Sequence, residues 1–502
     1  MEPTTNMDDP LKPRLSALVE GDSYRWTGRF ATSVVLMNHR PRGADDPRFI
    51  PLLPSSRRER RRREDTKELW NVFEQTSDTS KTSLNRQVSA RSLRALDALN
   101  IFLADVRDGV GPYLAIYLLA THHWDPASIG IAMSAMGIAT VIAQTPAGWL
   151  LDTLKQKRLL IVGAAVLVGM SCTAITAVPT LPFIVAAQTL NGIAVAVFPP
   201  AVASITLGLV GPMRFAARMG RNEAFNHGGN VAAAALAGLA GYALGREWLF
   251  YLVAAIAVAS AVSVLFIRET EIDHQLARPA APLTVSAQQE DESFISMLAR
   301  PELLIFALAV TLFHFANAAM LPLAGQLLSI GKTTGASLYM SACIIAAQLV
   351  MIPVAALAGT LADRWGRRRV FLIGFLVLPI RGCLYTLNDD PIYIVMVQLL
   401  DGIGAGIFGV LWVTVVADLT KGTGRYNVTL GAIATAQSIG AALSNLTAGY
   451  IVQLWGYPAG FLSLAGVAAL ALGLFYCAMP ETKNAISYLS APTALPTRYQ
   501  ET

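Results

Sequence analysis

Apolar residues follow one another along this chain in long runs that short polar segments separate. From residue 97 onward twelve such runs occur, at approximately 97–119, 127–150, 159–178, 182–210, 224–245, 248–267, 302–328, 336–358, 370–387, 392–417, 429–453 and 460–479. Runs of about 20 residues are as long as a helix must be to cross the hydrocarbon core of a bilayer. The pattern therefore predicts an all-α membrane protein with twelve transmembrane helices in two groups of six.

Polar stretches divide the chain into domains. Residues 1–94 hold no run long enough to span a membrane and no visible signal peptide, so we expect a disordered cytosolic tail. Residues 271–300 are predicted to be a cytosolic linker between two six-helix halves, 95–270 and 301–485. Residues 486–502 are predicted to be a cytosolic C-terminal tail.

The composition agrees with a chain that lies mostly in the apolar interior of a membrane. Hydrophobic residues make up 54% of the chain and charged residues only 15%, against roughly 25% charged residues in soluble domains. The four cysteines, Cys172, Cys343, Cys383 and Cys477, all lie in apolar runs, which favours packing over disulfides or metal binding. The net charge of +5 is better explained by cytosolic loops than by nucleic-acid binding.

A strongly basic segment joins the eighth and ninth apolar runs. It reads Gly359-Thr-Leu-Ala-Asp363-Arg364-Trp-Gly366-Arg367-Arg368-Arg369, and we predict a short water-facing loop there. A degenerate copy, Gly148-Trp-Leu-Leu-Asp152-Thr-Leu-Lys155, lies 211 residues earlier. The segment resembles the loop that follows the second helix of each half in the major facilitator superfamily. We therefore expect the segment and its copy to act as gating loops, in which Asp363 and the arginines help to hold the inner gate closed.

Other segments repeat between the halves. The stretch from Gln188 to Phe198 matches the stretch from Gln398 to Phe408, and Arg268-Glu-Thr270 matches Pro480-Glu-Thr482. Internal repeats of this kind are typical of secondary transporters, whose substrate site lies between the repeats. The resemblance implies a monomeric transporter that works by alternating access, with helices one, four, seven and ten lining a central cavity.

The subfamily stays unassigned. Many drug–proton antiporters of the superfamily have an arginine in helix four and a Gly-Pro pair in helix five. Gln188 stands at the first position here, and Gly228-Gly229 has no proline.

Basic residues predict the orientation. The loops on the side of the Asp363 segment are rich in lysine and arginine, and the opposite loops carry few of them. Since basic residues accumulate on the cytoplasmic side, both termini are expected in the cytosol, and the plasma membrane is the expected location. A cluster from Arg57 to Arg63 either binds anionic lipid headgroups or is a solvated charge run.

Polar pairs interrupt the four helices that would line the cavity. Each pair has a spacing of three residues, which puts both members on one helical face. The pairs are Asp105 and Asp108, Gln188 and Asn191, His314 and Asn317, and Gln398 and Asp401. A charge at the centre of a membrane helix costs roughly 2.5–3.5 kcal/mol and usually marks a substrate or ion pathway. We therefore predict a polar cavity for substrate and protons, although the glutamines could simply join helices.

Asp401 is the preferred proton-coupling residue, because its repeat counterpart Asn191 does not titrate. Arg107 is expected to pair with Asp108 or with Asp401, either as a switch that protonation releases or as a fixed ion pair. His314 either relays protons or is a neutral hydrogen-bonding residue.

Two further polar features lie in the apolar runs. A stripe of polar residues at helical spacing consists of Glu223, Asn226, His227 and Asn230. It is interpreted as an inner gate, a substrate contact or a region that is simply solvated at the membrane interface. Arg381, whose counterpart by the loop alignment is Met170, has no clear role, and snorkelling towards the outer surface is one interpretation.

The sequence carries no sign of an enzyme. The Gly402-Ile-Gly404-Ala-Gly406 patch lies in an apolar run and lacks a Walker lysine, so close helix packing is its better interpretation. We find no ATPase motif, nucleophile–base arrangement or metal-ligand spacing, and expect no cofactor. The leading hypothesis is a proton-coupled exporter of a small organic solute. A proton-coupled uptake symporter and a non-transporting membrane sensor are the alternatives.

Overall fold

The described part of the chain is helical. The computed structural model describes residues 88–108, 110–274, 276, 300–330, 335–421, 423 and 425–483. In these ranges the chain forms α-helices and one short 3-10 helix, η1 (Glu269–Glu271), and no β-strand. This confirms the predicted all-α class. The basic cluster from Arg57 to Arg63 lies outside the described residues, as do the side chains of Asp108 and Asp152.

The first group of helices accounts for the first six apolar runs. It comprises α4 (Ala90–Asp108), α5 (Gly111–His122), α6 (Pro126–Thr153), α7 (Lys157–Ala177), α8 (Leu181–Val195), α9 (Phe198–Val210), α10 (Pro212–Ala243) and α11 (Trp248–Leu265). Helix α4 starts seven residues before its apolar run because Ser89 caps it: Ser89 Oγ accepts a hydrogen bond of 3.2 Å from the Ser92 amide.

The second group accounts for the other six runs. It comprises α13 (Pro301–Ala318), α14 (Met320–Ser329), α15 (Ala336–Trp365), α16 (Arg367–Leu384), α17 (Pro391–Leu419) and α18 (Tyr426–Ala478). Helix α18 holds two apolar runs and is interrupted by Gly456, whose φ of 82° is left-handed. Eight segments of the described chain are long and apolar enough to cross a membrane.

Three predicted helices are broken near their middle. The breaks separate α4 from α5, α8 from α9 and α13 from α14. Prolines explain two of them, since Pro112 stands at the start of α5 and Pro199 at the start of α9. Proline lacks the amide that an interior turn needs but fits the first turn of a new helix. Helix α17, which holds Asp401, is continuous.

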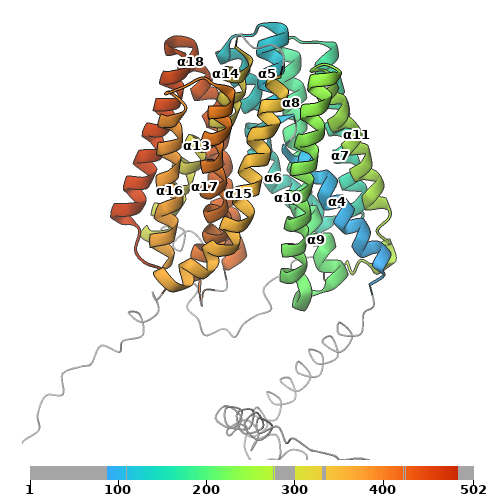
Figure 1. Cartoon of the computed structure of the whole chain (residues 1–502). Helices are drawn as coiled ribbons and strands as arrows, with labels where there is room; N and C mark the ends of the chain where they lie inside the picture. The colour runs from blue at the N-terminus through green and yellow to red at the C-terminus, as the bar shows by residue number, and fades with distance from the viewer. Residues whose placement is uncertain are drawn as a thin grey trace, which may run out of the picture. The chain divides into compact units, whose positions relative to one another are not determined.

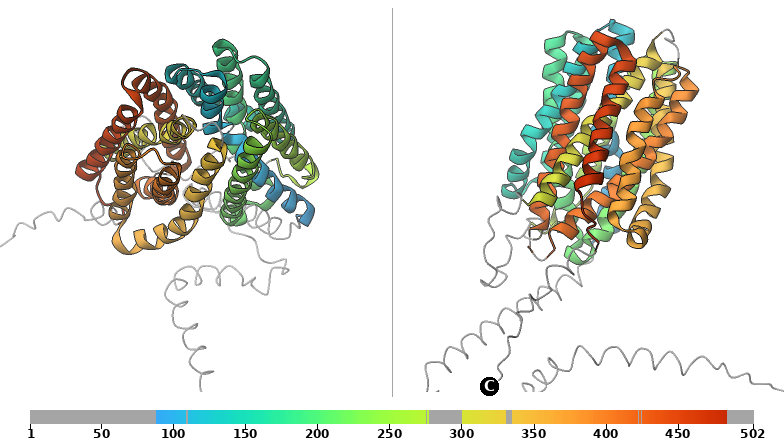
Figure 2. Two further views of the ribbon diagram at one scale, coloured as in Figure 1. Left: turned by 45° about the horizontal axis from the view of Figure 1, so that its top comes forward. Right: turned by 90° about the vertical axis from the view of Figure 1, so that its left-hand side faces the viewer.

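The two groups contact each other mainly through three helix pairs. Helix α6 packs against α18, α10 against α15, and α5 against α14. In Figure 1 the groups lie close together at the end with α5 and α14 and diverge towards the end with α9. Figure 2 shows the helices of both groups running roughly along one direction. The closed end is therefore the one opposite the Asp363 segment.

Small residues allow this close contact. A Cβ atom on Gly130 of α6 would lie 2.5 Å from the Asn445 carbonyl oxygen of α18, and one on Gly238 of α10 would lie 2.4 Å from the Ser341 hydroxyl of α15. Ser341 also hydrogen-bonds Tyr113 of α5 at 2.7 Å. Without hydrophobic driving force in lipid, such close van der Waals packing and hydrogen bonding hold helices together.

Candidate functional site

Arg381 and Asp401 form an ion pair inside the second group of helices. Arg381 extends from α16, and its Nη1 donates to Oδ1 of Asp401 on α17. Its Nη2 donates to Oδ1 of Asn317 on α13 at 2.6 Å. Arg381 is only 1% exposed, whereas the Asp401 side chain is 21% exposed. The pair thus joins three helices and leaves the carboxylate as its accessible member.

A second hydrogen-bond chain reaches Asp401 from the other side. Gln398 Nε2 donates to Asp401 Oδ2 at 2.8 Å, and the Tyr385 hydroxyl donates to Gln398 Oε1. Gln398 and Tyr385 are both fully buried. Because Tyr385 occupies the amide oxygen, the amide nitrogen is directed at the carboxylate.

His314 lies on the same helix as Asn317 but in apolar surroundings. Its Nδ1 contacts the Val310 carbonyl oxygen at 3.0 Å, a bond within its own helix. Its ring packs edge-on against Phe408, with 4.7 Å between ring centroids, and also against Phe313. These contacts suit a neutral imidazole, and the proton-relay role of His314 stays a prediction.

The polar residues of the first group form a separate cluster. Asn191 Nδ2 donates to Gln188 Oε1 at 3.1 Å, and both residues are buried on α8. Asp105 of α4 is near enough to Tyr113 and Cys172 to interact with them electrostatically. Their assignment to a substrate or proton pathway stays a prediction.

The α10 stripe contributes one contact across the interface. His227 Nδ1 lies 3.0 Å from Gln348 Oε1 on α15, in the other group. Asn226 and Asn230 are half-buried, and Glu223 is exposed. His227 is thus placed where the two groups meet, and the inner-gate role of the stripe stays a prediction.

The basic segment is mostly helical, which corrects the prediction of a loop from Gly359 to Arg369. Helix α15 continues through Thr360, Asp363 and Arg364 to Trp365, and only Gly366 separates it from α16. No proline or glycine stands between Gly359 and Gly366, and the φ of 100° at Gly366 favours glycine. A Cβ there would also lie 2.3 Å from the Glu481 carboxylate.

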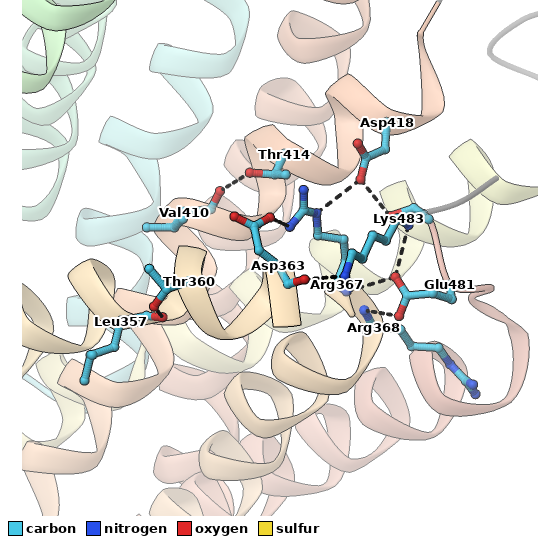
Figure 3. A network of polar contacts seen from close by, with 11 residues as sticks. Leu357, Thr360, Asp363, Arg367, Arg368, Val410, Thr414, Asp418, Glu481 and Lys483 are labelled. Carbon is cyan, nitrogen blue, oxygen red and sulfur yellow. Dashed lines mark hydrogen bonds and ion pairs between the residues drawn. The ribbon is translucent and has the colours of Figure 1, made fainter. Parts of the chain in front are cut away.

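Around this turn lies the charged network drawn in Figure 3. Arg367 Nη1 bonds Oδ1 of Asp363 at 2.5 Å, and its Nε bonds Oδ2 of Asp418 on α17 at 3.3 Å. The Glu481 carboxylate accepts from the Arg367 amide at 2.9 Å and from the Arg368 amide at 3.2 Å. It thereby satisfies the free N–H groups at the start of α16 and favours its dipole.

In the described part of the first half, the acid that corresponds to Glu481 binds side chains and not backbone amides. Glu269, which the Arg268-Glu-Thr270 repeat aligns with Glu481, forms a salt bridge with Arg158 on α7 and lies 3.1 Å from His274. In both halves an acid after the last helix therefore binds the start of the third helix. Gly148 of the copy lies within α6, with no atom within 4 Å of an added Cβ.

The structure corrects two interpretations of buried charge. The partner of Asp401 is Arg381, not Arg107. Arg381 is buried in this ion pair and does not snorkel. The residue that corresponds to Arg381 in the first group also changes. The loop alignment gave Met170, which is 64% exposed, whereas the next residue, Ser171, is buried like Arg381 and is therefore the better match.

A buried charge cluster between α4 and α10 was not anticipated. Asp97 binds Arg218 at 2.6 Å and Arg221 at 2.8 Å, and Arg218 is 8% exposed. The spacing of Arg218 and Arg221, one helical turn, could have shown that they share a face. Their partner on α4 could be found only from the fold.

The comparisons with known proteins identify the class. Residues 97–358 and 345–497 match the family model described as Major Facilitator Superfamily. The chain therefore belongs to the major facilitator superfamily and is an integral membrane protein of the transporter class. The match confirms the resemblance seen in the sequence, and the subfamily remains unassigned.

Relatives and solved structures agree with this assignment. The chain is 51% identical over 407 residues to the Mycobacterium tuberculosis proteins named "Uncharacterized MFS-type transporter", Rv2456c in strain H37Rv and MT2531 in strain CDC 1551. The match covers 81% of this chain and 97% of theirs. A mutant of the nucleoside transporter NupG has a similar fold, with a TM-score of 0.65, 16% identity and coverage of 77% of this chain and all of that chain. Another NupG structure gives a TM-score of 0.60.

Proposed function

We propose that the protein is a proton-coupled exporter of a small organic solute that works by alternating access. The observation that carries the proposal is the ion pair of Arg381 and Asp401 among membrane-spanning helices. Charges in such helices are costly and usually mark a substrate or ion pathway. A carboxylate that can bind and release a proton is what a proton-driven carrier requires.

Protonation of Asp401 would act on the packing of three helices. The neutral acid no longer attracts the guanidinium of Arg381, so the contact between α16 and α17 weakens. Through Arg381 and Asn317 the same change reaches α13. One proton can thus bias the relative stability of two arrangements of the second group, which is what coupling requires.

The unequal exposure of the two partners supports export. Asp401 is accessible, and Arg381 is not, so an entering solute can contact the carboxylate directly. A cationic or hydrogen-bond-donating solute and a proton then compete for one group. Competition for a shared site couples opposite movements, and a proton gradient directed inward would drive such a solute outward.

The test is transport by the full-length protein in proteoliposomes under an imposed pH gradient, with a panel of small organic solutes. Nucleosides belong in the panel because the structural neighbour NupG is named a nucleoside transporter. We expect one solute to be accumulated by exchange with protons. Asp401→Asn should retain binding and passive exchange but lose accumulation. Thr414→Ala is a control on the same helix and should keep both activities, because within the described chain the Thr414 hydroxyl bonds only the Val410 carbonyl oxygen of its own helix.

Two results would contradict the proposal. If Asp401→Asn still concentrates solute against its gradient, Asp401 is not the coupling site. If a solute binds tightly but produces no flux under any gradient, the protein is a sensor and not a carrier.

The finer topology is part of the same proposal. We count twelve spans by taking α4/α5, α8/α9 and α13/α14 each as one broken helix and dividing α18 at Gly456. Both termini, the 271–300 linker and the turn at Gly366 would face the cytosol, in the plasma membrane. Cysteines introduced at Arg369, just after this turn, and at Asn388, both of them exposed, should then be labelled by impermeant thiol reagents from opposite sides.

A further inference from the structure

A small cavity adjoins the ion pair between α13, α16 and α17. Its volume is about 10 Å³, and Asn317, Arg381, Asp401, Gly404 and Ala405 are among its lining residues. A buried water molecule needs roughly this much space and two to four polar partners. The cavity therefore matches one water molecule in size, and it is too small for a solute.

One hydrogen-bond donor beside this cavity has no protein partner. Nη1 and Nη2 of Arg381 bind Asp401 and Asn317, whereas Nε is buried without a hydrogen-bond partner among the described residues. An unsatisfied buried donor carries its full desolvation penalty. Each carboxylate oxygen of Asp401 accepts one hydrogen bond, from Arg381 or from Gln398, and retains a further lone pair. Arg381 and Asp401, which carry this donor and these acceptors, both line the same small cavity.

We infer that a single water molecule binds in this cavity, between Arg381 Nε and Asp401, and keeps the guanidinium hydrated when Asp401 is protonated. This inference rests on the proposed function, in which Asp401 cycles. A proton passes from a hydronium ion of the aqueous phase to a carboxylate oxygen, forming an O–H bond and leaving water. Arg381 keeps its charge and loses its anionic partner. Such an uncompensated buried charge is strongly unfavourable, and the bound water lowers that penalty.

Among the described residues, few other titratable groups surround the pair. Cys343 of α15 and Tyr385 of α16 are near enough to interact with Asp401 electrostatically. His314 of α13 lies one turn before Asn317. Helix α18 packs against α16 and α17 and contains no aspartate, glutamate, histidine, lysine or arginine in Tyr426–Ala478. The water is therefore the group that would most directly offset the charge of Arg381.

The glycines of α17 offer a matched pair of variants. A Cβ on Gly404 would meet only the Gly374 carbonyl oxygen, at 3.7 Å, so Gly404→Ala adds a methyl group beside the cavity without a clash. A Cβ on Gly409 of the same helix has no atom within 4 Å. Gly409→Ala therefore controls for helix propensity. Ala405→Val is a second cavity-filling variant in case Gly404→Ala does not fold.

The measurement is infrared spectroscopy of the reconstituted full-length protein during a pH titration without solute. The carboxylic-acid C=O band that disappears in Asp401→Asn belongs to Asp401. We expect Gly404→Ala to move the midpoint of this band to lower pH by about one unit or more, the size of a lost hydrogen bond to a charged group. Gly409→Ala should titrate like wild type.

An unchanged midpoint in a folded cavity-filling variant would overturn the water site. The proposed function has a separate readout. If the Asp401 band shifts as expected but Asp401→Asn still accumulates solute, the water site stands and proton coupling at Asp401 fails.

Discussion

Arg381 of α16 donates to Asp401 of α17, and neither residue has a charged counterpart in the first group of helices. The burial pattern aligns Arg381 with Ser171, and the sequence repeat aligns Asp401 with Asn191. Either charge alone would be buried without a partner, at a cost well above that of the neutral residues. The two charges are therefore mutually dependent and confined to one half of the molecule.

Removing one partner should destabilise the protein more than removing both. We expect Arg381→Met to lower the free energy of unfolding by about 3 kcal/mol, because Asp401 is left without its cation. The double variant Arg381→Met/Asp401→Asn should recover most of that loss. Thermal unfolding in detergent measures both, and additive losses would show that the ion pair is not an energetic unit.

Asp363→Asn should impair transport and leave folding intact. The Asp363 side chain is 68% exposed, so its ion pair with Arg367 contributes little to stability. Its loss would nevertheless leave the Arg367 guanidinium with Asp418 as its remaining carboxylate partner among the described residues, which changes the network that holds α15, α16 and α17 together at this end. Asp152→Asn should be milder.

The control for Asp363→Asn lies one turn earlier. Among the residues that the structure describes, the Thr360 hydroxyl bonds only the Leu357 carbonyl oxygen of its own helix, so Thr360→Ala should transport normally. Membrane insertion and thermal stability of each variant give the folding check. Transport by Asp363→Asn at the wild-type rate would remove the gating role from this residue.

Glu271 should make the stability of the protein dependent on pH, because its carboxylate accepts hydrogen bonds from Ser89 at the start of α4. Burial opposes its ionisation, but hydrogen bonds from Ser92 and Ser89 outweigh this and lower its pKa below the ordinary value of 4.5. A lowered pKa means that the contribution of the carboxylate to stability is complete above about pH 4.5 and is lost as the pH falls through the folded-state value.

The matching experiment compares wild type with Glu271→Gln between pH 7 and pH 4. We expect the variant to unfold at a lower temperature at pH 7 and the difference to shrink towards pH 4. A difference that stays constant over this range would mean that the charge of Glu271 makes no contribution.

Gly130→Ala should weaken the closed end of the interface between the groups. The added Cβ would lie 2.5 Å from the Asn445 carbonyl oxygen and 3.1 Å from Gly449 Cα, so α6 and α18 must separate. Labelling of Ser341→Cys by a thiol reagent, in a background without the native cysteines, should accelerate. Gly163→Ala, where an added Cβ meets no atom within 4 Å, should not change it. Equal labelling rates in both variants would contradict this account.

Periodicity and repeats were sufficient for the class, the family and the approximate helix positions. A run of about 20 apolar residues has few alternatives to a spanning helix. The repeated segments around Asp363 and Gln398 are similar enough to their copies to align the two halves. The failures were local. Helix α15 extends six residues past Gly359 because intrahelical hydrogen bonding continues until Gly366, whereas the polar composition of that segment predicted a loop.

The sequence determined which residues are unusual in the membrane, and only the tertiary structure decided which of them meet. Asp401 stood out because a carboxylate in an apolar run is costly, and Arg381 stood out for the same reason. Their partnership depends on how α16 is rotated and placed against α17, which side-chain packing over the whole second group decides. A shift of one residue along a helix turns a side chain by about 100°. Such a shift separates the exposed Met170 from the buried Ser171, and no pattern along the chain resolves a difference of that size.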